Sequence, residues 1–256
     1  MSRHFSMAFD DMNVGGVNGA AGVPYLHLLG NNSFGTWLFE TGTINDNDCL
    51  AFNEIRIGAS EDDNVIFGLQ FSGLGEPFEI TYNHQHGADL IETVDFDTPI
   101  MNNTWHHLMV VRDNAALTVN CWLDNVLVTP SPFNFTNVPT QTDGNSIWTY
   151  GARINGAQLA TGMTLSQSIY ASVAWTAAER LQVFQTGFTP RGCVFYHDMT
   201  ENVFPCRNLS GHGAEREADS DPISGEPVFS TNEPPNTPYV GEQVGLLWSP
   251  PQGWTF

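Results

Sequence analysis

Acidic side chains at alternate positions are the residues of this sequence that could perform hydrolysis. Glu215, Glu217, Asp219 and Asp221 would share one face of an extended chain. Retaining glycoside hydrolysis needs two carboxylates about 5 Å apart, one as nucleophile and one as acid and base. These four residues lie in a polar, proline-bounded run without aromatic residues, which is typical of a solvated acidic loop. The sequence therefore predicts no catalytic pair and no enzyme.

Two other aspartates could hold a cation. Asp95 and Asp97 alternate in the segment D-F-D-T, which resembles the metal-binding E-F-D-T strand of legume lectins. That strand is completed by a downstream Asn, Asp and His, whereas Met101 stands here in the position of the Asn. Asp95 and Asp97 could still bind Ca²⁺ together with loop oxygens. The alternative is two strand-end carboxylates that face water, and no other cofactor is predicted.

Four of the eight histidines form two close pairs. His84 and His86 could bind one metal, but no third ligand lies nearby in the sequence, and a turn with exposed histidines is the favoured interpretation. His106 and His107 stand in a segment typical of a core strand. We expect them to belong to the framework of that strand rather than to a catalytic site.

Aromatic and acidic residues near turns are the candidate contacts for sugars. Trp122 has polar neighbours on its own strand face, and it could stack on a sugar ring or simply pack beneath a loop. Loops at the rim of a sandwich gather ligands because the scaffold fixes them without constraining their sequence. The rim acids that this predicts as weak ligand contacts are Asp46, Asp48, Asp62 and Asp63.

The elements that would position these residues centre on residues 102–130. From Trp105 to Arg112 both alternating sets are largely apolar, which predicts a strand covered on both faces and a buried Trp105. An alternating strand follows, in which Cys121 and Trp122 face opposite ways. Asp124-Asn125 then predicts a tight turn, because short polar side chains tolerate positive φ. The whole stretch predicts a three-stranded meander.

The same residues carry a resemblance to a known family. The segments T-W-H-H-L, V-R-D and W-L-D-N-V are similar to laminin-G-like domains of the concanavalin A-like lectin and glucanase superfamily. Those domains usually have Gly at the position of Asn125. The resemblance covers about Phe5 to Gly187 and implies an antiparallel jelly-roll sandwich. The superfamily includes lectins, glycosidases, adhesion modules and virion proteins, so the resemblance alone implies no single function.

The rest of the chain fits an all-β sandwich, because short alternating segments recur at intervals of roughly ten residues. One short helix is predicted over residues 177–186, with Thr176 and Glu179 as a capping box and Gly187 at its end. We expect a jelly-roll domain over residues 1–190 and an extended Gly/Pro-rich arm over residues 191–256. The arm ends in apolar residues that are predicted to make assembly contacts: Leu246, Leu247, Trp248, Trp254 and Phe256.

Composition excludes some partners. The formal net charge is −20, so nucleic acid and anionic membrane surfaces would be repelled. We expect no signal peptide, because the first residues lack an apolar run. The four cysteines show no C-x-x-C pair, which argues against a structural zinc site. Whether Cys193 and Cys206 form a disulfide is left open by the sequence.

Two functions follow from these observations. The first is a non-enzymatic structural protein of a virus particle, either a capsid decoration or a tail protein, assembled in the host cytoplasm. It would dock through its arm on a homo-oligomer or on other virion subunits, and it resembles bacteriophage accessory proteins with trailing Gly/Pro-rich arms. The alternative is a lectin-like carbohydrate-binding module that uses a sheet face or the loop rim to hold a host-surface glycan.

Overall fold

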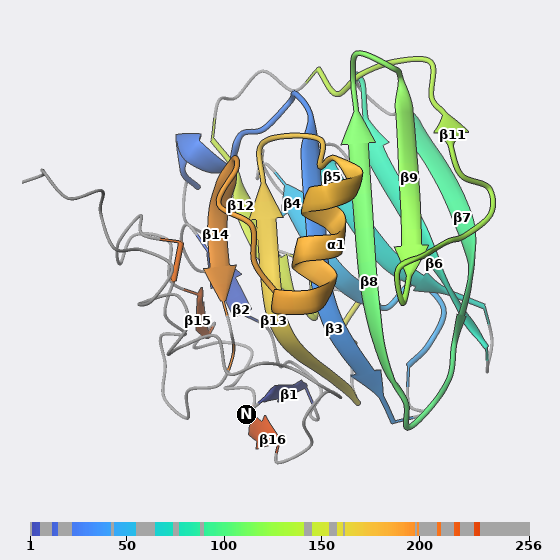
Figure 1. Ribbon diagram of the computed structural model, residues 1–256, viewed down its shortest axis with the longest axis vertical. Helices are drawn as coiled ribbons and strands as arrows, with labels where there is room; N and C mark the ends of the chain where they lie inside the picture. The colour runs from blue at the N-terminus through green and yellow to red at the C-terminus, as the bar shows by residue number, and fades with distance from the viewer. Residues whose placement is uncertain are drawn as a thin grey trace, which may run out of the picture.

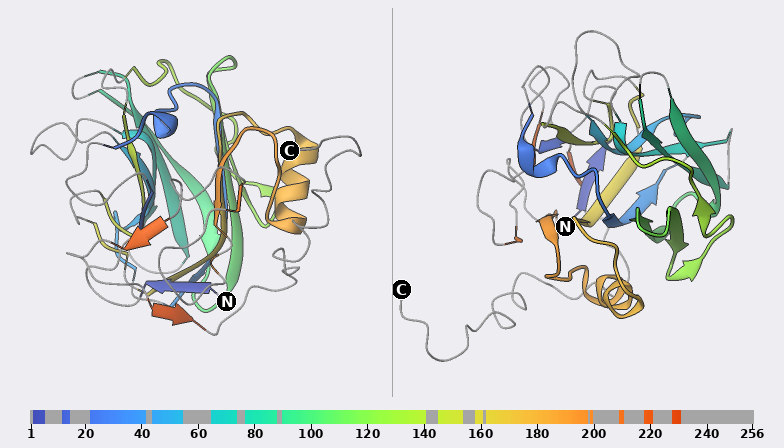
Figure 2. Two further views of the ribbon diagram at one scale, coloured as in Figure 1. Left: turned by 90° about the vertical axis from the view of Figure 1, so that its left-hand side faces the viewer. Right: turned by 90° about the horizontal axis from the view of Figure 1, so that it is seen from above.

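Two antiparallel β-sheets pack face to face, and one α-helix lies on the outer side of one of them (Figures 1 and 2). This arrangement confirms the all-β jelly-roll sandwich with one short helix that the sequence predicts. It is seen in a computed structural model that describes residues 2–5, 12–14, 22–41, 44–54, 65–73, 77–87, 90–140, 145–153, 158–160, 162–197, 199, 209–210, 218–220 and 228–230. No helix in these ranges is both long and apolar enough to span a membrane.

Sheet A has the strand order β10-β9-β8-β3-β13-β1-β16, with β11 beside β9 and β14 beside β13. Its strands are β1 (Ser2–Phe5), β3 (Asn32–Glu40), β8 (Trp105–Asp113), β9 (Thr118–Leu123), β10 (Val126–Leu127), β11 (Phe133–Asn134), β13 (Met163–Ala171), β14 (Cys193–His197) and β16 (Val228–Ser230).

Sheet B has the order β15-β2-β12-β4-β5-β6-β7. Its strands are β2 (Met12–Val14), β4 (Cys49–Glu54), β5 (Val65–Ser72), β6 (Phe78–Gln85), β7 (Ile91–Ile100), β12 (Ile147–Tyr150) and β15 (Ala218–Ser220). A 3-10 turn, η1 (Pro24–Leu26), precedes β3.

The segment beyond residue 190 contributes strands to both sheets. β14 pairs with β13, β15 pairs with β2, and β16 pairs with β1. The domain boundary predicted after residue 190 therefore precedes three strands that the sandwich includes. Residues 231–256, with all five predicted assembly contacts, lie outside the described residues.

The predicted meander is present. β8 pairs with β9, and β9 pairs with β10 across a turn in which Asp124 and Asn125 have φ values of 52° and 64°. Both values lie in the left-handed region, which Asp and Asn enter more readily than most residues. The local sequence is thus sufficient to set this turn.

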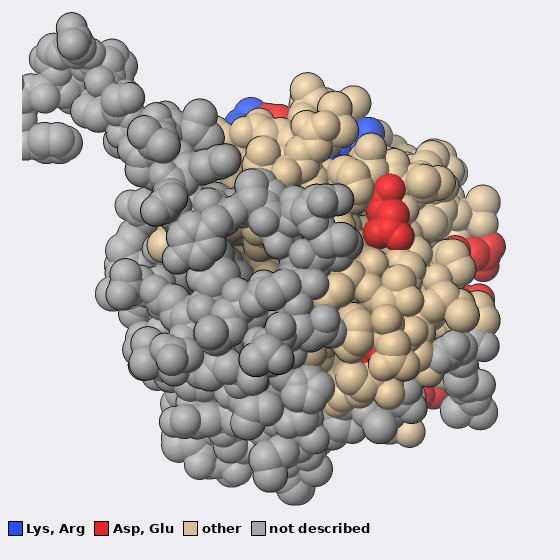
Figure 3. All heavy atoms as spheres, turned by 60° about the horizontal axis from the view of Figure 1, so that its bottom comes forward, with Lys and Arg blue, Asp and Glu red and all other residues tan. Residues whose placement is uncertain are grey.

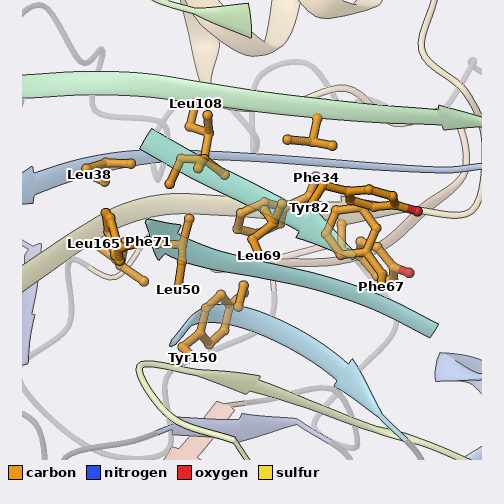
Figure 4. Close-up of a cluster of buried hydrophobic side chains, with 14 of the residues drawn as sticks. Phe34, Leu38, Leu50, Phe67, Leu69, Phe71, Tyr82, Leu108, Tyr150 and Leu165 are labelled. Atoms are coloured by element: carbon orange, nitrogen blue, oxygen red, sulfur yellow. The ribbon is translucent and has the colours of Figure 1, made fainter. Parts of the chain in front are cut away.

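The space between the sheets is filled by aromatic and aliphatic side chains. In Figure 4 Phe34, Leu38 and Leu108 of sheet A face Phe67 and Leu69 of sheet B. Aromatic rings dominate one part of this inter-sheet core, where the ring centroids of Trp148 and Tyr170 are 4.3 Å apart. Burial of so much apolar surface is the main stabilising contribution to such a sandwich.

A fully buried cation lies in the same core. The Arg112 guanidinium of β8 donates through Nη2 to the carbonyl oxygens of Leu28 (2.9 Å) and Gly30 (2.8 Å), and through Nη1 to that of Ile66. The charge is thus solvated by backbone dipoles. Arg112 connects β8 of sheet A to β5 of sheet B and to the segment before β3.

The outer face of sheet A carries a second apolar core beneath α1 (Ala177–Thr186). We call it the helix-side cluster: Met109, Val111, Trp122, Ile169, Ala171, Trp175, Val183, Cys193 and Tyr196. Gly35 allows the helix to approach, since a Cβ there would lie 3.1 Å from Val183 Cγ1. β8 is therefore covered on both faces, as predicted.

The ends of α1 match the sequence prediction. The Thr176 hydroxyl accepts from the Glu179 amide while the Glu179 carboxylate accepts from the Thr176 amide, and Gly187 ends the helix at φ 74°. These local bonds satisfy amide groups that the first helical turn leaves unpaired. The strand prediction is less accurate at Trp105, which is half-buried against Phe39 rather than buried, because α1 does not extend over the start of β8.

Candidate functional site

The outer face of sheet B carries a hollow of about 190 Å³ that crosses four neighbouring strands. Phe52 of β4, Gln70 of β5 and Asn83 of β6 form its floor, and Ile91 and Thr93 of β7 form one rim. On these strands the opposite set of side chains packs in the inter-sheet core, so period-two alternation places this set outside. We call the hollow the amide pocket.

Three carboxamides bond to one another in this pocket. Asn83 Nδ2 donates to Gln70 Oε1 at 2.8 Å, and Gln70 Nε2 donates to Gln158 Oε1 at 2.8 Å. Gln70 Nε2 also lies 3.3 Å from the carbonyl oxygen of Asn47. Each amide in this row fixes the next, which makes the polar floor of the pocket a connected network.

Loops from distant parts of the chain hold the network in place. Asn47 has φ 69°, and its amide donates to Phe71 O at 2.8 Å, which holds its turn against β5. Gln158 has φ 55°, and its carbonyl accepts from Cys49 N at 2.7 Å, beside β4. Both loop residues are thus positioned by backbone bonds to the edges of the pocket.

A glycine makes room for the amides. At Gly68 of β5 a Cβ would fall 2.3 Å from Asn83 Oδ1 and 2.7 Å from Phe52 Cε1. Real Cβ atoms do not approach so closely, so any side chain here would displace Asn83 or Phe52. Gly68 is therefore required by the close approach of the pocket floor.

The charge beside the pocket is internally balanced. Arg153 donates to Glu54 Oε2 through Nε (3.0 Å) and Nη2 (2.8 Å), and its guanidinium lies 5.1 Å from the centre of the Phe52 ring. Because Arg153 covers this ring and Phe52 is buried, the aromatic face cannot stack on a sugar. Apolar contact is instead offered by Ile91, whose side chain is 52% exposed.

Two of the predicted rim acids flank the amide pocket, since they stand on either side of Asn47. Asp46 Oδ1 accepts from Gly73 N at 3.2 Å, and Asp48 Oδ2 accepts from Asn45 N at 2.7 Å. Burial raises the pKa of Asp48, and the hydrogen bonds from Asn45 only partly offset this. Both acids shape the turn rather than line the hollow. The other two rim acids, Asp62 and Asp63, lie outside the described residues.

Trp122, the predicted sugar platform, lies on the opposite side of the molecule. It is 9% exposed, and the Arg180 guanidinium of α1 is 4.0 Å from the centre of its ring. The ring face that a sugar would need is thus occupied by this chain's own cation. The structure favours the second interpretation of Trp122, that it packs beneath another segment.

The predicted calcium ligands are exposed on the outer face of β7. Asp95 Oδ1 accepts from the Thr81 hydroxyl at 2.5 Å, and Asp97 Oδ2 accepts from the Thr129 hydroxyl at 2.6 Å. Within the described ranges no three His, Cys, Asp or Glu side chains gather as a metal site. These carboxylates therefore bond β7 to β6 and to the segment after β10.

The first histidine pair does not form an exposed turn, and that prediction is wrong. His84 is buried in β6, with Nδ1 2.9 Å from Tyr82 Oη and Nε2 2.8 Å from Asn137 O. Burial lowers the pKa of His84 to about 4, and the nearby Arg112 charge adds to this. The ring is therefore neutral, and it joins β6 to the segment after β11. His86 lies 3.8 Å from Glu92 Oε1.

The second pair is structural, as expected. His106 Nδ1 lies 2.8 Å from Asp124 Oδ2, and Asp124 Oδ1 accepts from His107 N at 2.8 Å, so the pair connects β8 to the β9–β10 turn. His107 is buried beneath α1 between Trp37 and Phe184, with ring centroids 5.0 Å and 5.4 Å away. Burial lowers the pKa of His107 to about 3.

A second, larger hollow of about 440 Å³ lies near β14. Its polar side chains are those of Tyr25, Ser172 and Cys193, and the rest of its lining is apolar or glycine. The Ser172 hydroxyl already donates to Gly192 O at 3.2 Å, and the Cys193 thiol to Phe195 O at 3.4 Å. Despite its size, this hollow offers few polar groups with which to recognise a ligand.

Other candidates from the sequence cannot be placed. Glu215, Glu217, Asp221 and Cys206 lie outside the described residues, and at Asp219 the structure describes only the backbone of β15. Gln70, Asn83, Arg153 and Gln158 were not predicted from the sequence. A signal exists for the first two, because both are polar residues on the outward-facing set of strands whose inward set is apolar.

Comparison with known proteins reveals similarity in structure but none in sequence. The sequence matches no protein-family model and no curated protein. A candidate carbohydrate-binding protein from Bacteroides ovatus is similar in structure, with a TM-score of 0.56, 13% identity and 86% of this chain covered. The match spans 57% of the length of that protein.

A heptameric pentraxin from Limulus polyphemus is also similar, with a TM-score of 0.51, 11% identity, 88% of this chain covered and 95% of the pentraxin. Both are concanavalin A-like sandwiches, and at such low identity the likeness concerns the fold alone. The resemblance seen in the sequence is thus confirmed at the level of a concanavalin A-like, lectin- or glucanase-like fold. The finer resemblance to laminin-G-like domains and to bacteriophage proteins stays a prediction.

Proposed function

We propose that this chain is a non-enzymatic, lectin-like module that binds a glycan in the amide pocket. The observation that carries the proposal is the row of bonded carboxamides, Asn83, Gln70 and Gln158, on the outer face of sheet B. Planar polar side chains of this kind both donate to and accept from sugar hydroxyls. A pocket that fixes a few polar groups beside an apolar contact is the usual form of a small-ligand site.

The chemistry of the pocket favours binding over hydrolysis. No carboxylate occurs among the described residues that line it, whereas retaining hydrolysis needs two about 5 Å apart. The nearby carboxylate of Glu54 is engaged by Arg153. We therefore expect no release of reducing ends from any polysaccharide that the protein binds.

The test is a glycan array followed by pocket variants. The wild-type protein should bind at least one glycan, with Kd for a single site on the order of 1 mM, because a small pocket without aromatic stacking supplies only about 4 kcal/mol. Asn83→Ala and Gln158→Ala should lower this binding at least tenfold. Glu79→Gln, on the same face of β6, should not change it. Failure to bind any glycan, or binding that survives both pocket variants, contradicts the proposal.

The virus-particle hypothesis stays a prediction, together with its homo-oligomer or virion partners. It rests on the resemblance to bacteriophage accessory proteins and on the docking arm, whose apolar end lies outside the described residues. Because β16 pairs with β1, a truncation that tests this hypothesis should follow Ser230 and thereby keep all the described strands. Loss of assembly with an unchanged melting temperature would support a docking role for residues 231–256, and unchanged assembly would contradict it.

A further inference from the structure

The orientation of the amide row in the pocket is fixed by one backbone atom. The carbonyl oxygen of Asn47 can only accept hydrogen bonds, so the Gln70 group that faces it, at 3.3 Å, must be the amide nitrogen. The oxygen of Gln70 then faces Asn83, which must present Nδ2. Gln158 must present Oε1 to Gln70 Nε2, at 2.8 Å. Amide orientations that are ambiguous in isolation are thus determined by the network.

This orientation decides which groups remain for a ligand. The two N–H groups of Gln158 make no bond to the other amides, and they form the donor end of the pocket. On the rim, the Thr93 hydroxyl uses its hydrogen on Tyr82 O at 3.3 Å, which leaves its oxygen as an acceptor. Asn83 Oδ1 lies over Gly68, where it fills the space of the missing Cβ. The pocket therefore presents a donor and an acceptor, and no unpaired charge.

We infer that the ligand of the amide pocket is a neutral, hydroxyl-bearing sugar ring, and that Gln70 is the residue that sets this specificity. The inference rests on the proposed function, and it names the class of glycan. A hydroxyl group both accepts and donates, so hydroxyls can satisfy Gln158 and Thr93 together. A single ring is expected because about 190 Å³ is less than the ~300–1,000 Å³ of pockets for larger ligands.

Charged sugars fit this arrangement poorly. A carboxylate could accept from Gln158, but it could not donate to the Thr93 oxygen. It would also be repelled by the nearby Asp46 and Asp48 and by a chain whose net charge is −20. Figure 3 shows acidic side chains dispersed over the described surface in that view, with basic ones only near its upper edge. An ammonium group has only donors, so it cannot accept from the N–H groups of Gln158. Both charges are therefore disfavoured.

The specificity can be tested with sugars that share one ring. The methyl glycosides of glucose and galactose, their uronic acids and the matching 2-amino sugars would be titrated by NMR against the full-length protein. At least one neutral sugar should bind ten times more tightly than its acidic and amino counterparts. A uronic acid that binds as tightly as its neutral counterpart overturns this inference but leaves the glycan site in place. If no sugar binds, both the proposed function and this inference are overturned.

Two isosteric variants test the role of the amide orientation. Gln70→Glu sets a carboxylate against the Asn47 carbonyl and Gln158 Oε1, so binding of the neutral sugar should fall at least tenfold. Gln158→Glu keeps an acceptor for Gln70 but replaces the outer donor by a second acceptor. It should reverse the ranking, so that the amino sugar binds more tightly than the neutral one. Glu79→Gln is the control, and melting temperatures check the fold. An unchanged ranking in Gln158→Glu overturns the inference.

Discussion

The outer faces of the two sheets have opposite chemistry. On sheet A the outward residues include Trp37, Met109 and Trp122, and α1 covers them to make a second core. On sheet B the outward residues of β5 and β6 include Gly68, Gln70 and Asn83, and they form the amide pocket. Similar strand alternation thus produces a closed apolar layer on one side and a polar hollow on the other.

Under the proposed function, this difference separates the residues that stabilise the sandwich from those that bind the glycan. The helix-side cluster is apolar, and its residues contribute to the free energy of unfolding through burial. In the amide pocket the carboxamides bond to one another, and Ile91 is exposed at the rim. We therefore expect substitutions on the sheet A face to change stability and substitutions on the sheet B face to change binding.

The largest effect is expected at Trp175, which is buried in the helix-side cluster. Trp175→Ala should lower the free energy of unfolding by about 3–5 kcal/mol, the range for a buried aromatic side chain truncated to alanine. Urea denaturation would measure the change. A loss below 1 kcal/mol would mean that α1 contributes little to the stability of sheet A.

His107 gives the closed face a pH dependence. Its folded pKa of about 3 is below the unfolded value of about 6.5, so the unfolded chain binds more protons between these limits. Stability is lost as pH falls from 6.5 to 3, by about 2 kcal/mol at pH 5 for this group. The Asp124 charge raises the pKa of His107 and thus opposes this shift only in part.

His107→Leu should remove that loss, so that the variant gains stability relative to wild type as the pH falls from 7 to 5. Denaturation at both pH values would measure the gain. Some acid sensitivity should remain, because the lowered pKa of His84 acts with the same sign. Equal sensitivity in variant and wild type would contradict the burial of a neutral His107.

Trp105 marks the limit of the covered face. It is half-buried and packs on Phe39, with ring centroids 5.4 Å apart, but it does not belong to the helix-side cluster. Trp105→Ala should therefore cost about 1–2 kcal/mol, less than the full burial that its sequence context predicts. A thermal melt compared with Trp175→Ala would rank the two. Equal costs would mean that Trp105 is as well buried as Trp175.

The smallest stability effect is expected on the open face. Ile91→Ala should change the free energy of unfolding by no more than about 0.5 kcal/mol, the usual limit for exposed positions. The same variant should weaken glycan binding, because Ile91 supplies the apolar contact at the rim. A large loss of stability without loss of binding would reverse the comparison between the two faces.

The sequence predicts the local features well because their causes are local. The capping box at Thr176 and Glu179, the helix end at Gly187 and the turn at Asp124-Asn125 each depend on residues within a few positions. The alternation in β8 and β9 also predicts which side chains share a face. These features place the meander and the helix correctly.

The candidate site could be predicted only in outline. Asp46 and Asp48 mark its edge, but the amide row joins residues 70 and 83 to residue 158, and no local pattern connects them. Trp122 shows the same limit, since alternation predicts that it faces outward but cannot show that Arg180, 58 positions later (180 − 122), covers it. Tertiary packing decides both cases.

Glycan binding in the amide pocket is tested most directly by mapping where a sugar binds on the protein. Methyl, side-chain amide and indole resonances would be followed by NMR while the neutral methyl glycoside that binds best is added to the wild-type protein. Binding in the amide pocket predicts saturable shifts at the Ile91 methyl groups and the Gln158 side-chain amide, with none at Val183, on the buried side of α1. Shifts confined to the indole of Trp122 or to Val183, with Ile91 and Gln158 unchanged, would contradict it.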